Sequence, residues 1–178
     1  MGSENSIEAM TYYSDFVKKG YANKEVLNWS QADVCKQFAS GNCAMMVNGS
    51  WNVGTLRNDV PDKNWGVVPI PEDKVPASCL GGEALCITKN ADADACFEFI
   101  EYLCGKEISA PYAKSVAKFS PRSDVDIDKE FADDPEMKVF AEQMENTKPR
   151  GPYPKWTEVD NVIIEACQSA LTEAKTPE

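Results

Sequence analysis

The sequence predicts an α/β fold with an excess of helix. Six segments carry apolar residues at helical spacing, and three short apolar runs are typical of strands in a covered sheet. Neither an internal repeat nor a low-complexity segment interrupts this pattern. A chain of 178 residues can bury a full hydrophobic core, yet three strands make a thin sheet for that length.

Capping residues and stop signals place the six helices. The expected N-terminal caps are Asn5, in a capping box with Glu8, then Ser30, Asp92, Asp134 before Pro135, and Thr157. Gly20, Gly41 and Gly105 are expected to end the first three helices. The fourth helix spans Lys106 to Val116, with Pro111 as a weak point. Apolar residues recur on one face of each helix, as an amphipathic helix requires.

Three apolar runs predict the strands. They are Cys43 to Val47, Trp65 to Ile70, and Glu83 to Thr88. Cys79-Leu80 is also expected to be extended, and Gly81-Gly82 separates it from the third strand. A glycine pair between two extended segments indicates a close backbone approach or a hinge.

Trp51 follows the first predicted strand, at its carboxyl end. Asn48-Gly49 permits a sharp turn there, and Ser50 can cap the helical turn that holds Trp51. Open α/β sheets bind ligands at this edge. An indole beside an amide and free backbone N–H groups suits a ligand with an apolar ring face and a rim of hydroxyls, such as a sugar. The alternative is that Trp51 is a core residue that closes a βα unit, as we expect for Trp29 and Trp65.

Charge and composition exclude several classes of function. A net charge of −11 repels phosphate, so no binding to nucleic acid or to an anionic membrane surface is expected. Seven scattered cysteines without a Cys-x-x-Cys pair, and no histidine, argue against a zinc site and remove the commonest general base. Asp124, Asp126 and Asp128 lack the Gly and Glu of a calcium loop and are expected in a solvated loop. We therefore expect no metal and no cofactor.

A series of motifs resembles one known family. Phe38 to Trp51 resembles the F-x-x-G-x-A-M-x-x-N-G-x-W motif of the carbohydrate-binding proteins of ABC transporters, the maltose-binding-protein-like extracellular solute-binding family. The same order continues with Trp65 to Pro71, Gly81-Gly82 and a strand, a helix containing Ala95 to Ile100, Pro121-Arg122, and Arg150-Gly151-Pro152. The resemblance covers essentially the whole chain, but it matches only the carboxyl-terminal half of the family's proteins.

The resemblance implies an incomplete two-lobed fold of the periplasmic-binding-protein type II. Residues 3–79 and 118–178 would form the second lobe, 80–83 a hinge crossing, and 84–117 a segment of the first lobe, whose remainder would be missing. Half a cleft would bind sugar feebly. The apolar face of the 92–104 helix, without its partner, would favour self-association of the chain or a rearranged packing.

The resemblance also implies a function and a set of site residues. The chain would bind a mono- or oligosaccharide between two lobes and deliver it to the permease subunits of an ABC transporter. It would be a membrane-anchored lipoprotein or a periplasmic protein, with a signal sequence absent from this chain, since Met1-Gly2-Ser3 does not look like one. The implied ligand-binding residues are Trp51, Asn48, Gly81, Gly82, Glu83 and Arg150.

Two alternatives remain at this stage. A glycoside-processing enzyme would pair Glu83 with another carboxylate across a tryptophan-lined cleft, although no motif fixes such a pair. A structural interaction domain would bury Trp51 in its core. For the single residues, Glu83 can be a ligand or a solvated carboxylate, and Arg150 can bind ligand or pair with an acidic neighbour.

Overall fold

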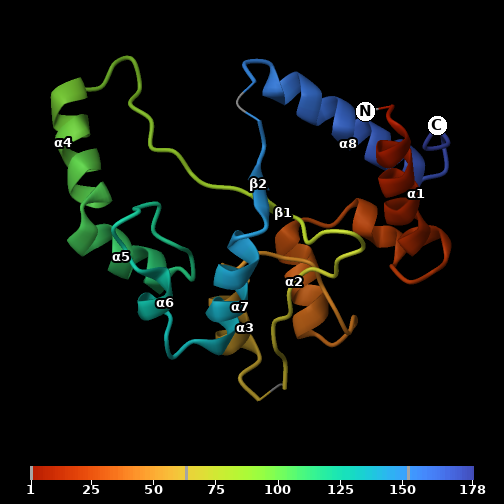
Figure 1. Cartoon of the computed structure of the whole chain (residues 1–178), viewed down its shortest axis with the longest axis horizontal. Coiled ribbons are helices and arrows are strands. Elements are labelled where there is room, and N and C mark those ends of the chain that lie inside the picture. Colours follow the sequence, from red (N-terminus) through yellow and green to blue (C-terminus); the bar gives the residue numbers. More distant parts are fainter. Residues whose placement is uncertain (1, 63, 152) are drawn as a thin grey trace. The chain divides into compact units, whose positions relative to one another are not determined.

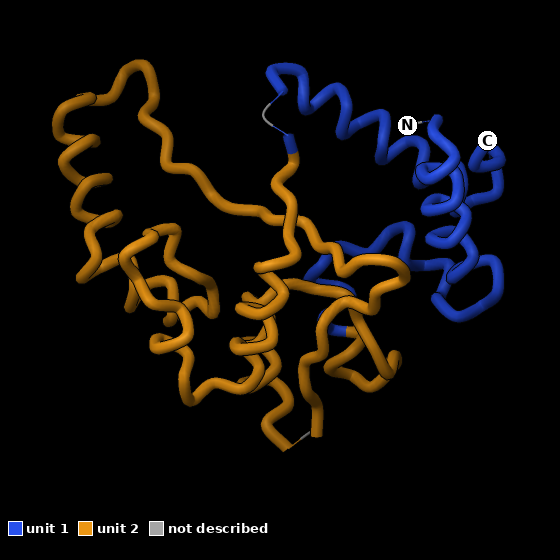
Figure 2. The backbone as a smooth tube through the Cα atoms, viewed as in Figure 1, with its two compact units in different colours: residues 1–36, 151–178 blue, residues 37–150 orange. Residues whose placement is uncertain are grey.

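The chain forms two compact units in a computed structural model that describes residues 2–62, 64–151 and 153–178. One unit combines residues 1–36 with 151–178, and the other spans 37–150 (Figure 2). Met1, and Pro152 of the Arg150-Gly151-Pro152 motif, lie outside the described residues.

Helices dominate both units (Figure 1). In the first unit the helices are α1 (Glu4–Lys18), the short 3-10 helix η1 (Lys24–Leu27) and α8 (Trp156–Leu171), and α2 (Gln31–Ala39) spans the boundary between the units. In the second unit they are α3 (Asn52–Asp59), α4 (Ala93–Cys104), α5 (Lys106–Ser115), α6 (Ile127–Glu130) and α7 (Pro135–Met144). The two strands, β1 (Ser78–Leu80) and β2 (Thr147–Pro149), both belong to the second unit.

Local capping chemistry explains most helix starts, and the sequence predicted three of them correctly. Ser30 and Asp33 form a reciprocal capping box at α2, where the Asp33 N–H donates to Ser30 Oγ at 3.3 Å. The side chain of Asp92 caps α4, and that of Asp134 caps α7. Gly41, with φ at +79°, ends the turn after α2, as predicted from its freedom in the left-handed region.

Three cap predictions were wrong. Ser50 does not cap the helix at Trp51, because the N-cap of α3 is Trp51 itself and no side chain caps that helix. Ser3, not Asn5, caps α1, because its hydroxyl accepts the N–H of Ser6 and leaves Asn5 inside the first turn. The last helix begins at Trp156, one residue before the expected cap Thr157, and no side chain caps it.

Two helical segments, η1 and α6, were not predicted. A helical turn was expected at Trp51, and α3 extends it as far as Asp59. Asp126 caps α6 by accepting the N–H of Lys129, so Asp128 lies in a helix and not in the solvated loop expected from its charge. This helix has only four residues, too few to show an apolar pattern, and it forms because the Asp126 side chain caps its first turn.

The three predicted strands are wrong as assigned. Residues 43–47, 65–70 and 83–88 all lie outside the two strands of the described chain. Met45 is 86% exposed, so the first of these segments is not buried either. An apolar run indicates only that a segment could be a strand, whereas a strand exists through backbone bonds to a partner, and these segments have none in the described sheet.

The sheet of the described residues consists of β1 and β2, paired in parallel. The register sets Ser78 opposite Thr147 and Leu80 opposite Pro149. Only the Cys79-Leu80 part of β1 was expected to be extended, and β2 was not predicted. The described chain is therefore helix-rich with a minimal parallel sheet, a composition compatible with part of a solute-binding lobe.

Each unit has its own buried residues. Helices α1 and α8 pack on each other, and Val17 and Ala170 are buried on them. In the second unit Val53, Phe131 and Met137 form the core, where Met137 is only 1% exposed. Trp65 packs against that cluster, which confirms its expected place in the core.

Candidate functional site

Trp51 stands at the start of α3, held by its own turn. The backbone of Gly49 lies so close to the indole that a Cβ at Gly49 would overlap three carbons of the six-membered ring. Only glycine permits this contact. The side chain of Asn52 is buried and donates from Nδ2 to Asn48 Oδ1 at 2.7 Å, which closes the turn.

The exposure of Trp51 decides between two sequence-based interpretations. The side chain is 44% exposed, and it is not part of the buried cluster of the second unit. The interpretation of Trp51 as a core residue closing a βα unit is therefore wrong. One part of the ring rests on Gly49, and the rest is available to another molecule.

Lys118 joins Trp51 to Glu83. Its Nζ lies 5.9 Å from the centroid of the Trp51 ring and forms an ion pair with Glu83 Oε1. The hydrogen bond from Lys118 and its charge hold the pKa of Glu83 below its ordinary value. Glu83 is therefore a carboxylate at neutral pH, free to accept hydrogen bonds on its other lone pairs because its side chain is 77% exposed.

Arg150 is brought to Gly81 by the strand register. Leu80 is opposite Pro149, so Gly81 and Arg150 both follow directly after paired residues. An Arg150 guanidinium nitrogen lies 3.6 Å from the position that a Cβ of Gly81 would occupy. Among the described residues no carboxylate forms an ion pair with Arg150. The alternative that Arg150 pairs with an acidic neighbour therefore has no support from these residues.

The predicted site residues thus fall into two contacting groups linked by a short piece of chain. Trp51, Lys118 and Glu83 form one, and Gly81 with Arg150 forms the other. Gly82 lies between Gly81 and Glu83, and all three are exposed. Three consecutive Cα atoms span at most about 7 Å, so the two groups are close neighbours.

The ligand-binding role of Asn48 stays a prediction, and Lys118, which lies beside Trp51, was not singled out from the sequence. The Asn48 side-chain oxygen already accepts from Gly49 N and Asn52 Nδ2, so its visible role is to hold the turn. Lys118 stands in a connector with no motif around it. Its place beside Trp51 comes from a contact between residues 67 positions apart, and no local signal in the sequence could have revealed it.

An ion-pair cluster fixes α3, and with it the Trp51 turn. Arg57 on α3 makes two hydrogen bonds to Asp134, at 2.7 and 3.0 Å, and a third to Glu136 at 2.6 Å. The bonds from Arg57 lower the pKa of Asp134, and the same bonds raise the pKa of Arg57. Asp134 also caps α7 through Met137 N, so one carboxylate ties two helices together.

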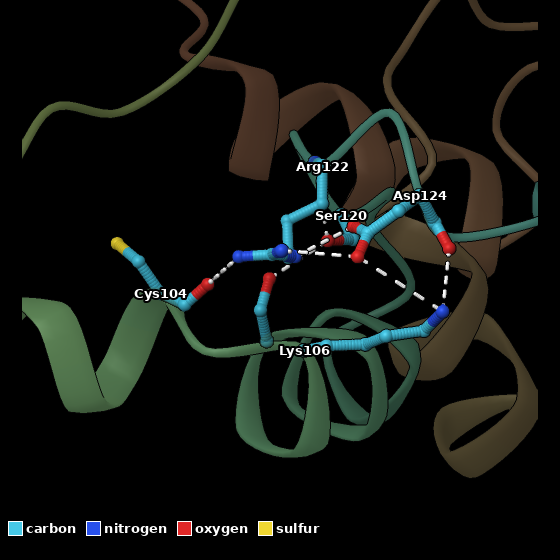
Figure 3. A network of polar contacts seen from close by, with 6 residues as sticks. Cys104, Lys106, Ser120, Arg122 and Asp124 are labelled. Atoms are coloured by element: carbon cyan, nitrogen blue, oxygen red, sulfur yellow. Dashed lines mark hydrogen bonds and ion pairs between the residues drawn. The ribbon is translucent and has the colours of Figure 1, made fainter.

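A second polar network surrounds Arg122, part of the Pro121-Arg122 motif (Figure 3). Its guanidinium donates to the Cys104 carbonyl at 2.9 Å, at the end of α4, and to both carboxylate oxygens of Asp124. The bond to Asp124 raises the pKa of Arg122 and lowers that of Asp124. Beneath it, the hydroxyls of Ser109 and Ser120 lie 2.7 Å apart in a buried pair. This motif residue therefore joins α4 and α5 to the connector that carries Lys118.

Neither a metal site nor a membrane span was found in the described chain. Residues 2–62, 64–151 and 153–178 contain no group of three or more acidic or cysteine side chains placed to hold a metal ion. None of their helices combines the length and hydropathy that a bilayer crossing requires.

Comparison with known proteins identifies the family. Residues 2–139 match the family described as bacterial extracellular solute-binding protein, a range that includes Trp51, Glu83 and Lys118 and ends before Arg150. A search among curated proteins found no match. Proteins of the matched family bind a small molecule outside the cell for a transporter and are generally not enzymes. This chain belongs to the bacterial extracellular solute-binding protein family.

Proposed function

We propose that the bound solute is a carbohydrate and that Trp51 is its stacking platform. The observation that carries the proposal is the half-exposed indole, seated on Gly49, beside an ammonium and a carboxylate. A sugar offers an apolar ring face to such a surface and hydroxyls to the charged groups around it. Gly81, Gly82 and Arg150 extend the site, and Asn48 positions its turn.

In this proposal the solute is handed to the permease subunits of an ABC transporter. The chain would act as a membrane-anchored lipoprotein or as a periplasmic protein. Residues 3–79 and 118–178 would form the second lobe of a type II fold, 80–83 a hinge crossing, and 84–117 a segment of the first lobe. Ala117, next to the second of these boundaries, has φ at +51°, the left-handed conformation with which helices commonly end.

The state of Glu83 argues against its acting as the general acid of a glycosidase. A glycosidase acid needs a carboxyl group with a raised pKa, so that it carries a proton at neutral pH. Lys118 acts in the opposite sense, since it lowers the pKa of Glu83. A carboxylate of this kind accepts hydrogen bonds from sugar hydroxyls and has no proton to donate.

We also propose that the chain self-associates through α4. Phe97, Phe99 and Tyr102 are 56%, 59% and 60% exposed, although Ile100 and Leu103 on the same helix are half-buried. Aromatic side chains have about 150–250 Å² of surface each, so the three expose a few hundred square ångströms of mainly apolar surface. A second copy of the chain would cover it.

The sugar proposal is tested by titrating the chain with mono- and oligosaccharides while its tryptophan fluorescence is recorded. We expect a saturable change only at high sugar concentration, because half a cleft binds sugar feebly. The change should disappear in Trp51→Ala and persist in Trp29→Phe, a control at a tryptophan of the other unit. A change that survives in Trp51→Ala would show that the sugar binds elsewhere. If no saccharide changes the fluorescence of the unaltered chain, the proposal fails.

A further inference from the structure

We propose that the solute is an acidic saccharide, whose carboxylate is bound by Lys118 and Arg150 while its ring stacks on Trp51. The inference rests on the proposed sugar-binding function and adds the charge of the ligand. It comes from the balance of charge at the site. The chain carries a net charge of −11, yet the site combines two cations, Lys118 and Arg150, with the single carboxylate of Glu83.

The position of Lys118 suits a ligand that lies on the indole. Its Nζ lies over the ring, 5.9 Å from the centroid, near the outer limit of a cation–π contact. A sugar ring stacked at about 3.5–4 Å from the indole would bring its substituents within hydrogen-bonding reach of this ammonium. An ammonium has three donors, and the Glu83 pair uses one of them.

Arg150 supplies the second cation. Its side chain is exposed, and one of its guanidinium nitrogens lies 3.6 Å from the position that a Cβ of Gly81 would occupy. Within the described ranges, 2–62, 64–151 and 153–178, no acidic side chain neutralises it. A guanidinium presents paired donors that match a carboxylate, so an exposed and unneutralised arginine beside a sugar platform favours an anionic ligand over a neutral one.

A substitution at Glu83 should affect the binding of acidic and neutral sugars differently. Because it pairs with Lys118, it competes with a ligand carboxylate for that ammonium and also repels it. Replacing Glu83 by glutamine removes both effects and keeps an oxygen that accepts from hydroxyls. An acidic sugar should therefore bind Glu83→Gln more tightly than the unaltered chain, whereas a neutral sugar should bind the two about equally.

The experiment compares three hexoses of similar size that differ in charge: galacturonate, galactose and galactosamine. Binding to the 178-residue chain is followed by tryptophan fluorescence at about 0.01 M and about 1 M salt. We expect galacturonate to bind about three- to tenfold more tightly than galactose at low salt, since exposed ion pairs contribute modestly, and we expect salt to reduce the difference. Galactosamine should bind no better than galactose.

Variants assign the preference to its residues. Lys118→Met and Arg150→Gln should each reduce the preference for galacturonate, and Glu83→Gln should increase it. Lys138→Met, which removes an exposed lysine of α7, should leave it unchanged. Equal binding of galacturonate and galactose, or tighter binding of galactosamine, would overturn the inference while leaving sugar binding at Trp51 intact. A chain whose Trp51 signal responds neither to these three sugars nor to the oligosaccharides of the first titration would overturn the proposed function as well.

Discussion

The Arg57–Asp134 contact allows a quantitative prediction about the element that carries the site. Arg57→Ala removes the ion pairs with Asp134 and Glu136, whereas Asp134→Ala removes the pair with Arg57 and also the cap of α7. The Arg57 side chain is 43% exposed, so the pair contributes only about 0.5–1 kcal/mol after screening. A lost cap costs about 1 kcal/mol more. We expect Asp134→Ala to destabilise the chain by about 2 kcal/mol and Arg57→Ala by about half of that.

The pH dependence gives the same prediction a second test. Arg57 lowers the pKa of Asp134 in the folded chain. A carboxyl group with a lowered folded pKa adds stability above its unfolded pKa of about 3.9, and that stability is lost as the pH falls through the folded value. The cost of Arg57→Ala should therefore be full at about pH 6 and should shrink below about pH 4.

Urea unfolding followed by circular dichroism at the two pH values measures both effects. Lys138→Ala, at an exposed lysine of α7, controls for the loss of a surface cation. Two results would refute the reasoning: an Arg57→Ala cost that stays the same in acid, or equal costs for Arg57→Ala and Asp134→Ala at neutral pH.

Three further predictions concern the Trp51 turn, the core and α4. Gly49→Ala should displace the Trp51 indole from its contact with residue 49, and so shift tryptophan fluorescence and weaken sugar binding. An unchanged emission spectrum would contradict the contact between Gly49 and the indole. Met137→Ala should cost about 2–5 kcal/mol in urea unfolding, because Met137 is 1% exposed; a cost below about 1 kcal/mol would exclude it from the core. Phe99→Glu should weaken self-association in sedimentation velocity, while Ala93→Glu, at the exposed start of α4, should not; a monomeric unaltered chain would refute the α4 interface.

The sequence predicted the helices well because their signals are local. Ser30, Asp92 and Asp134 each satisfy N–H groups within three residues, so the sequence alone contains the interaction that starts the helix. The errors at Ser3 and Trp156 are shifts of one or two residues: at the first helix another polar residue caps, and at the last no side chain caps at all.

The strands could not be predicted in the same way. Cys43 to Val47 has the composition of a buried strand, but a strand requires a partner that the segment itself does not specify. The pairing that does form joins Ser78 to Thr147, residues 69 positions apart, one in a strand too short to show a periodic pattern. Fold class was therefore predictable in its helical excess and not in its sheet.

The residues of the candidate site were likewise predictable only where their signal is local in the sequence. Gly49 and Trp51 were identified from one short stretch, because turn chemistry and an aromatic at its end are visible in sequence. Lys118 was missed, since only the fold brings it to Trp51. In the structure Glu83 pairs with Lys118, and Arg150 lies against Gly81. These contacts support the proposed roles of Glu83 and Arg150.

The central claim is that Trp51 is a ligand platform and not a structural residue. The measurement that tests it most directly is a pair of titrations on Trp51→Ala: sugar affinity, and the urea midpoint. A lost stacking contact is worth about 1–3 kcal/mol, by analogy with other flat ligands, and so about five- to 150-fold in affinity. Because Trp51 is 44% exposed, its truncation should leave the midpoint nearly unchanged. A drop of about 3–5 kcal/mol in stability, as for a core tryptophan, with sugar affinity retained, would contradict the account.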